Sequence, residues 1–181
     1  MFQLSESSQT ELLGLARQSI RQFLLAGKKN TQKSVNPELQ AQLGAFVTLH
    51  NQRCLRGCIG VISSALPLHE TVQDCAISAA TLDSRFDSVS LSELEEINIE
   101  ISVLSPLALV RNISDIEIGV HGLLVSSQGK RGLLLPQVAT EHQWNRETFL
   151  QQTCRKAGLP LDAWQRGAEV RTFTAYVFSE K

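Results

Sequence analysis

The sequence is poor in the residues that mark several specialised classes of protein. Aromatic residues make up only 6% of its 181 residues, and 17 lysines and arginines nearly balance 18 aspartates and glutamates. The formal net charge is −1, and no long block of one sign occurs. Proteins that bind nucleic acids usually combine a basic surface with aromatic side chains that stack on bases. The composition therefore argues against a nucleic-acid-binding module, which we keep only as a second alternative function.

Long apolar runs are also missing. No segment approaches the roughly 18 residues that a membrane-spanning helix needs, and residues 1–6 lack the charged and apolar regions of a signal peptide. We therefore expect a cytoplasmic protein with no membrane association. Its four cysteines are then expected to be free thiols.

The pair Cys54 and Cys58 invites a metal-binding interpretation, but its spacing argues against one. If both residues lie in one strand, their Cα atoms are about 13 Å apart. That separation is too long for a single zinc ion or a disulfide bond. We expect no metal site, and no motif indicates which cofactor, if any, the protein uses.

Hydrophobic periodicity predicts alternating helices and strands along the chain. The expected helices cover residues 9–26, 67–82 and 145–157, and the expected strands cover residues 44–50, 54–62, 97–104, 118–127, 131–135 and 170–178. Two pairs of these strands, 44–50 with 54–62 and 118–127 with 131–135, are separated by only a short turn, which predicts two hairpins. No linker or repeat divides the chain, so two subdomains that share a core are expected.

The segment 54–62 is the most informative stretch of the chain. It contains two glycines, Gly57 and Gly60, and a strand that keeps glycines usually bulges or lets another group approach its backbone. Arg56 and Cys58 leave an extended chain on the same face, about 6.6 Å apart. A fixed positive charge beside a thiol favours the thiolate. We therefore predict that this strand lines the floor of a pocket.

A two-residue turn at Asn51-Gln52 would pair this strand with the preceding one. Val47 would then lie opposite Arg56, and Ala45 opposite Cys58. The core-facing side chains would be those of Phe46, Leu55, Ile59 and Val61. The opposite face would carry Ala45, Val47, Arg56, Cys58 and Gly60. Because a buried arginine without a partner is costly, this second face is expected to meet a carboxylate, a cleft or a ligand.

The segment 83–87 follows the second helix and contains two carboxylates, an arginine and a phenylalanine. One interpretation is a structural turn in which Phe86 is a hydrophobic plug and Arg85 forms a local ion pair. The other is that Asp83 or Arg85 faces the strand that carries Arg56 and Cys58. The sequence does not decide between them.

Two histidines and two cysteines outside this region are further candidates for a site or for the core. His121 precedes Gly122 within an expected strand, where a bulge could turn the imidazole toward a site; the alternative is an exposed or hydrogen-bonded histidine. His69 is expected at the surface or the rim of the pocket. Cys75 and Cys154 fall on apolar helix faces and are expected to be core thiols.

Four segments together resemble the AMMECR domain family, whose prokaryotic members are called AmmeMemoRadiSam system protein A. They are Leu55-Arg56-Gly57-Cys58-Ile59-Gly60, Asp83-Ser84-Arg85-Phe86, Gly132-Leu133-Leu134-Leu135-Pro136-Gln137-Val138 and Cys154-Arg155-Lys156-Ala157-Gly158-Leu159. The similarity covers residues 8–178, as a single domain of two interlocked subdomains. Ser84 departs from the family pattern, which usually has proline there. The resemblance implies an α+β fold with mixed or antiparallel sheets and packed helices, divided into a larger and a smaller subdomain with a cleft between them. It also places residues 56–60 at the presumed site of the family.

The resemblance also implies two partners, a Memo-like protein and a radical S-adenosylmethionine (radical SAM) protein. Our leading hypothesis is that the cleft binds a small anionic ligand, or that the protein is a component of an enzyme system with those partners. The first alternative is a thiol-dependent enzyme. In these hypotheses Cys58 is the catalytic candidate, and the binding candidates are Arg56, Gly57, Gly60, Asp83, Arg85 and His121.

Overall fold

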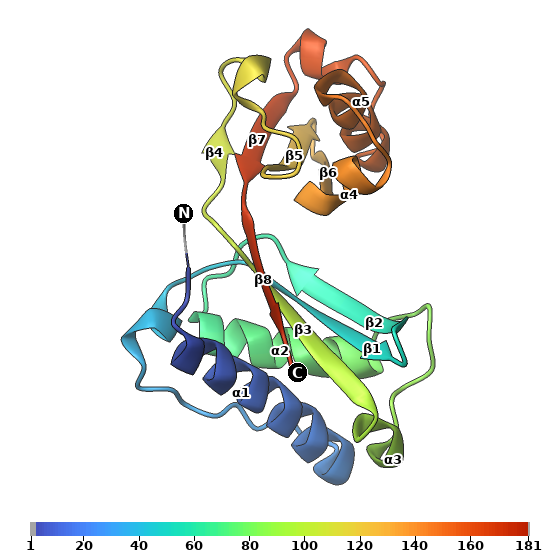
Figure 1. Ribbon diagram of the computed structural model, residues 1–181. Helices are drawn as coiled ribbons and strands as arrows, with labels where there is room; N and C mark the ends of the chain where they lie inside the picture. The colour runs from blue at the N-terminus through green and yellow to red at the C-terminus, as the bar shows by residue number, and fades with distance from the viewer. Residues whose placement is uncertain (1–2, 181) are drawn as a thin grey trace. The chain divides into compact units, whose positions relative to one another are not determined.

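Two four-stranded sheets organise the chain, one in each of two structural units (Figure 1). The structure is a computed structural model that describes residues 3–180. Unit 1 comprises the chain up to Leu104 together with the segment from Tyr176 onward, and unit 2 comprises Ser105–Ala175. The fold is α+β, as predicted, because helices pack on antiparallel sheets in both units.

The sheet of unit 1 has the strand order β2-β1-β3-β8. The elements associated with this unit are α1 (Glu6–Ala26), η1 (Pro37–Gln40), β1 (Ala45–Asn51), β2 (Cys54–Val61), α2 (Leu68–Thr81), α3 (Leu91–Leu94), β3 (Ile97–Leu104) and β8 (Ala175–Ser179). Helices α1 and α2 pack against each other, and both contact the sheet. The apolar face of α2 is buried, and it carries Val72, Cys75 and Ala79.

The sheet of unit 2 has the strand order β4-β7-β5-β6. Its elements are β4 (Ala108–Leu109), η2 (Ile113–Asp115), β5 (Gly122–Ser127), β6 (Lys130–Leu134), α4 (Pro136–Glu141), α5 (Arg146–Lys156), η3 (Ala163–Arg166) and β7 (Glu169–Phe173). The predicted strand over residues 170–178 is therefore wrong as a single element. Its residues form β7 and β8, which belong to different sheets.

The hairpin of β1 and β2 differs from the prediction in register. Its turn is Gln52-Arg53, where both residues have positive φ (48° and 68°), and a bulge lies between Leu49 and His50. Val47 pairs with Ile59, not with Arg56. A turn that comes one residue later moves the pairing by two positions, and the bulge moves it by one more. This odd shift brings the other face of β1 beside Cys58.

The shift in register changes which side chains are buried. Ala45 and Val47 are fully buried, and Thr48 is the residue opposite Cys58. Leu55 and Val61 were expected in the core, but they are 40% and 41% exposed. They are exposed because β2 is an edge strand of the sheet, so its ends have no neighbour on one side.

His69 is a second correction. It was expected at the surface or a rim, but only 3% of it is exposed. Helix α2 contacts α1, η1, β1 and β2, so even the first turn of the helix is enclosed by other elements. Local sequence periodicity does not reveal this enclosure, because it depends on contacts with distant segments.

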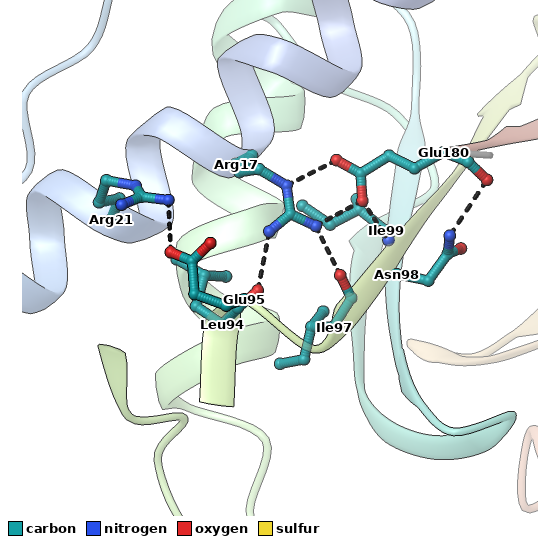
Figure 2. A network of polar contacts seen from close by, with 8 residues as sticks. All are labelled: Arg17, Arg21, Leu94, Glu95, Ile97, Asn98, Ile99 and Glu180. Atoms are coloured by element: carbon teal, nitrogen blue, oxygen red, sulfur yellow. Dashed lines mark hydrogen bonds and ion pairs between the residues drawn. The ribbon is translucent and has the colours of Figure 1, made fainter. Parts of the chain in front are cut away.

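Arg17 links three parts of unit 1, as Figure 2 shows. Its Nε and Nη2 atoms donate to the two carboxylate oxygens of Glu180 at 2.7 and 2.6 Å. Nη1 donates to the carbonyl of Leu94, and Nη2 also donates to that of Ile97. Glu180 in turn accepts the backbone amide of Ile99. Helix α1 is thereby tied to the start of β3 and to the segment after β8.

Within residues 3–180, no helix combines the length and the apolar character that crossing a membrane requires.

Candidate functional site

At each of the two glycines of β2, other atoms of the protein occupy the place that a side chain would take. A Cβ atom at Gly57 would lie 2.2 Å from the carbonyl oxygen of Ala79 in α2. A Cβ atom at Gly60 would lie 2.3 Å from the aromatic ring of Phe46. The close approach that the glycines predicted is therefore made by helix α2 and by a neighbouring side chain. In this structure Gly57 and Gly60 position the strand that carries the other candidates.

Asp83 and Arg85 meet the backbone of β2 at Cys58. Asp83 Oδ2 accepts the Cys58 amide hydrogen at 2.8 Å, and the Arg85 Nη2 lies 3.5 Å from the Cys58 carbonyl oxygen, to which it donates. Arg85 also donates to the Asp83 carboxylate from Nε at 2.9 Å and from Nη2 at 2.7 Å. The local ion pair of the first interpretation is therefore present, and the pair also faces β2, as the second interpretation expected. Phe86, the hydrophobic plug of the first interpretation, is only half-buried.

This arrangement holds the Asp83 carboxylate in its ionised form. The Arg85 guanidinium, and then the Cys58 amide, lower the pKa of Asp83 far below its usual value. The side chain of Asp83 is only 5% exposed, whereas that of Arg85 is 55% exposed. The carboxylate is therefore an internal anchor, and the guanidinium is the part that solvent can reach.

Arg56 has the carboxylate partner that its position required. Its Nε donates to Glu93 Oε1 at 2.5 Å, and its Nη2 donates to Glu93 Oε2 at 3.1 Å. This contact lowers the pKa of Glu93. Sequence reasoning missed this role of Glu93. The pattern Ser90-x-x-Glu93 is typical of a helix cap, and Ser90 Oγ accepts the Glu93 amide hydrogen, but the pattern gives no sign of a contact with Arg56.

Phe86 lies between the two arginines. The Cζ atom of Arg85 is 5.4 Å from the ring centroid, and that of Arg56 is 5.9 Å from it. Both distances are within the range of cation–π contacts. A surface hollow of about 450 Å³ adjoins this arrangement, and we call it the Arg56–Arg85 hollow; its lining residues are Arg56, Ser84, Arg85, Phe86 and Asp87.

Cys58 is two positions after Arg56 in the sequence and is half-buried. It is not one of the residues that line the Arg56–Arg85 hollow. The Thr48 hydroxyl donates to the Cys58 sulfur at 3.3 Å. Within residues 3–180, no histidine or carboxylate side chain hydrogen-bonds that sulfur. The charge of Arg56 is directed to Glu93. The structure thus brings Cys58 together with Asp83 and Arg85 through its backbone, and with Thr48 through its thiol.

His121 belongs to unit 2, while Arg56, Cys58, Asp83 and Arg85 belong to unit 1. His121 comes just before β5, and its Nδ1 accepts the backbone amide hydrogen of Glu117 at 3.0 Å. It lies in a turn that begins at Glu117, because its own amide donates to the Glu117 carbonyl. The hydrogen-bonded alternative for this histidine is the one observed.

Two of the other three cysteines are core groups, while Cys54 is exposed. Cys75 and Cys154 are buried, as predicted, and burial raises the pKa of Cys75 to about 11. Burial also raises the pKa of Cys154. In the part of the chain that the structure describes, no group of three or more histidine, cysteine, aspartate or glutamate side chains is placed to hold a metal ion.

Comparison with known proteins assigns the chain to a family. The AMMECR1 family model matches residues 13–178. The chain belongs to the AMMECR1 family. Protein PF1979 of Pyrococcus furiosus is 40% identical, in a match that covers all of this chain and 92% of that protein. A protein of Methanococcoides burtonii is 42% identical, in a match that covers 99% of this chain and 92% of the relative.

A solved structure supports the fold of this AMMECR1-family chain. The crystal structure of the uncharacterized protein PH0010 from Pyrococcus horikoshii matches it with a TM-score of 0.90 and 38% sequence identity. The match covers 99% of this chain and 95% of the crystallised one. The family and the α+β fold that the sequence motifs implied are therefore confirmed.

Proposed function

We propose that this AMMECR1-family protein binds a small anionic ligand at the Arg56–Arg85 hollow. One observation carries the proposal. Both arginines are held by carboxylates through the same edge of the guanidinium, the edge formed by Nε and Nη2. Within residues 3–180, the Nη1 groups of both arginines donate to no protein acceptor. Two fixed guanidinium groups therefore keep donors for a ligand.

The Asp83 carboxylate, which holds Arg85, has little capacity for further hydrogen bonds. Asp83 already accepts four hydrogen bonds, from the Cys58 amide and from three Arg85 donors. Arginine forks recognise carboxylates and phosphates, and a guanidinium fixed in advance loses less conformational freedom on binding. Phe86 adds an apolar wall, and Asp87 is the acidic residue of the lining. We therefore favour a ligand with a single acidic group over a polyanion.

A titration followed by nuclear magnetic resonance tests this proposal. The Nε–Hε signals of the arginines are recorded while acetate or inorganic phosphate is added. We expect the signals of Arg56 and Arg85 to shift together and to saturate. Arg85→Gln should abolish the shift at Arg56. Arg21→Gln is the matched control, because Arg21 is also paired with a carboxylate in unit 1. Equal shifts at Arg21, or no saturable shift at Arg56 and Arg85, would refute the proposal.

We also propose that the protein acts in the cytoplasm as a component of an enzyme system with a Memo-like protein and a radical SAM protein. The support is the resemblance of its four motifs to AmmeMemoRadiSam system protein A. Purified candidates of both kinds can be mixed with this protein and separated by size-exclusion chromatography. Co-elution that Arg85→Gln weakens would support a partner at the Arg56–Arg85 hollow. Separate elution at micromolar concentrations would contradict the association.

The second candidate function is a thiol-dependent enzyme with Cys58 as nucleophile. The observation that favours it is the hydrogen bond that Thr48 donates to the Cys58 sulfur, because this contact fixes the position of a thiol that is only half-buried. Comparison of the labelling rates of Cys58 and the exposed Cys54 distinguishes the two functions.

A further inference from the structure

A second hollow lies within unit 2, and it shares no lining residue with the Arg56–Arg85 hollow. It has a volume of about 380 Å³, and we call it the Trp144 hollow; its lining residues are Leu134, Trp144, Gln152, Arg155 and Lys156. Gln152, Arg155 and Lys156 are spaced three and four residues apart on α5, so they share one face of that helix. The hollow therefore has an apolar side and a cationic side.

The walls of the Trp144 hollow are held in place by close backbone packing. A Cβ atom at Gly132 in β6 would lie 2.2 Å from the backbone nitrogen of Ala157, so the end of α5 rests directly on the strand. The Trp144 amide donates to the Ala139 carbonyl at 2.8 Å, and its ring stacks on His142 with centroids 4.6 Å apart. A ligand would meet side chains that are already positioned.

The cations of this hollow are uncompensated. Within the described residues, neither Arg155 nor Lys156 has a carboxylate oxygen within 4 Å. Among residues 3–180, the one hydrogen bond of the Arg155 side chain is donated by Nη1 to Gln152 Oε1, at 3.5 Å. No acidic side chain lines the hollow. Cations near a helix C-terminus are favoured by the helix dipole, but the dipole does not explain an exposed apolar wall beside them.

We infer that the Trp144 hollow binds a small aromatic anion, meaning a planar ring that carries a carboxylate or a phosphate. The ring would pack on Leu134 and Trp144, and the acidic group would accept hydrogen bonds from Arg155 and Lys156. The volume lies near the lower end of the range for small-molecule sites, so it suits a ligand about the size of a nucleoside monophosphate or smaller. This inference does not depend on the function proposed for unit 1.

Tryptophan fluorescence tests the inference. The chain has two tryptophans, so Trp164→Phe leaves Trp144 as the only one. The probes are adenosine monophosphate and nicotinate, which combine a ring with an anion, together with adenosine and inorganic phosphate, which each lack one part. We expect saturable quenching by the first two probes and none by the last two at equal concentration. If Trp164→Phe lowers stability, calorimetric titration of the unaltered protein replaces the fluorescence measurement.

Variants assign the binding to named side chains. Arg155→Gln and Lys156→Gln should each weaken binding about fivefold to tenfold, as expected for loss of one charge-assisted contact. Arg166→Gln removes the same charge from an exposed arginine that pairs with Asp162, and it should have no effect. Arg85→Gln should also have no effect, which separates this site from the one on unit 1.

Four results would overturn the inference: no saturable quenching at millimolar adenosine monophosphate and nicotinate, equal binding of adenosine, equal weakening by Arg166→Gln, or an octanucleotide that binds more than tenfold more tightly than adenosine monophosphate. The last result would mean that the hollow reads a polymer and not a small molecule.

Discussion

The Asp83 carboxylate accepts the backbone amide hydrogen of Cys58 at 2.8 Å, on the open edge of strand β2. Arg85 contacts the same residue of β2, because its guanidinium donates to the Cys58 carbonyl. Together they satisfy the two backbone groups that a neighbouring strand would otherwise bind. Exposed strand edges are sites of unwanted pairing, and charged side chains are one means of blocking them. The same pair can therefore serve the sheet and the hollow beside it.

We predict that Asp83→Asn destabilises the protein by roughly 1–3 kcal/mol at pH 7, because it removes a charged hydrogen-bond partner from a buried position. The pKa of Asp83 is lowered in the folded protein. Its contribution is then complete above the ordinary aspartate pKa of about 4 and is lost as the pH falls toward the lowered value. Urea unfolding at pH 7, 4 and 2.5 should show the difference from wild type shrinking. Asp87→Asn is the exposed control, and a difference that stays constant with pH would be inconsistent with this account.

Gly57→Val should lower the melting temperature more than Cys58→Ala. Any side chain at Gly57 would meet the Ala79 carbonyl at 2.2 Å, and such overpacking typically costs about 1–3 kcal/mol or more. Cys58 is only half-buried, and removing its sulfur leaves a small gap at the surface of the sheet. Thermal unfolding of both variants measures the comparison. Equal melting temperatures would show that α2 can move away from β2 at little cost.

Arg17→Met should be strongly destabilising, by about 3 kcal/mol, because Glu180 and two backbone carbonyls lose a partly buried cationic partner (Figure 2). Arg21→Met is the matched control on the same helix. Its partner Glu95 and Arg21 itself are largely exposed, so its loss should cost about 1 kcal/mol or less. Chemical denaturation of the two variants provides the measurement. Similar losses for both would mean that the Arg17 contacts add little to folding.

The four cysteines should react in a fixed order. Iodoacetamide at pH 8, followed by mass spectrometry of peptides, should label the exposed Cys54 first and the half-buried Cys58 more slowly. Cys75 and Cys154 should stay protected until the protein unfolds, since both are buried and burial raises the pKa of each thiol. If Cys58 reacts faster than Cys54 at neutral pH, the thiol-dependent enzyme becomes the better functional hypothesis.

The success of prediction from sequence followed how local each signal was. The strand over residues 97–104 was predicted with the correct ends, because its apolar and polar residues alternate cleanly. Helix α1 ends at Ala26, as predicted, because Gly27 adopts the left-handed conformation that stops a helix. The hairpin register was wrong, because the turn at Gln52-Arg53 lacks a glycine and the bulge has no residue signature.

The candidate site was predictable only in part for the same reason. The short separation between Asp83 and Arg85 allowed their ion pair to be foreseen. The partner of Arg56 is 37 residues away, in the short helix α3, and nothing in the sequence of that helix indicates the contact. The packing of Ala79 on Gly57 likewise depends on how α2 crosses the sheet.

The way the chain passes between its two units bears on how each of them can unfold. Ser105 and Thr174 lie at the two ends of unit 2 and are joined by two hydrogen bonds. The Ser105 amide donates to the Thr174 carbonyl, and the Thr174 amide donates to Ser105 Oγ, each at 2.9 Å. Strands β3 and β8, which these residues follow and precede, are neighbours in the unit 1 sheet. Unit 2 therefore begins and ends at two neighbouring strands of the unit 1 sheet. We expect that unit 2 can unfold locally while β3 and β8 stay paired.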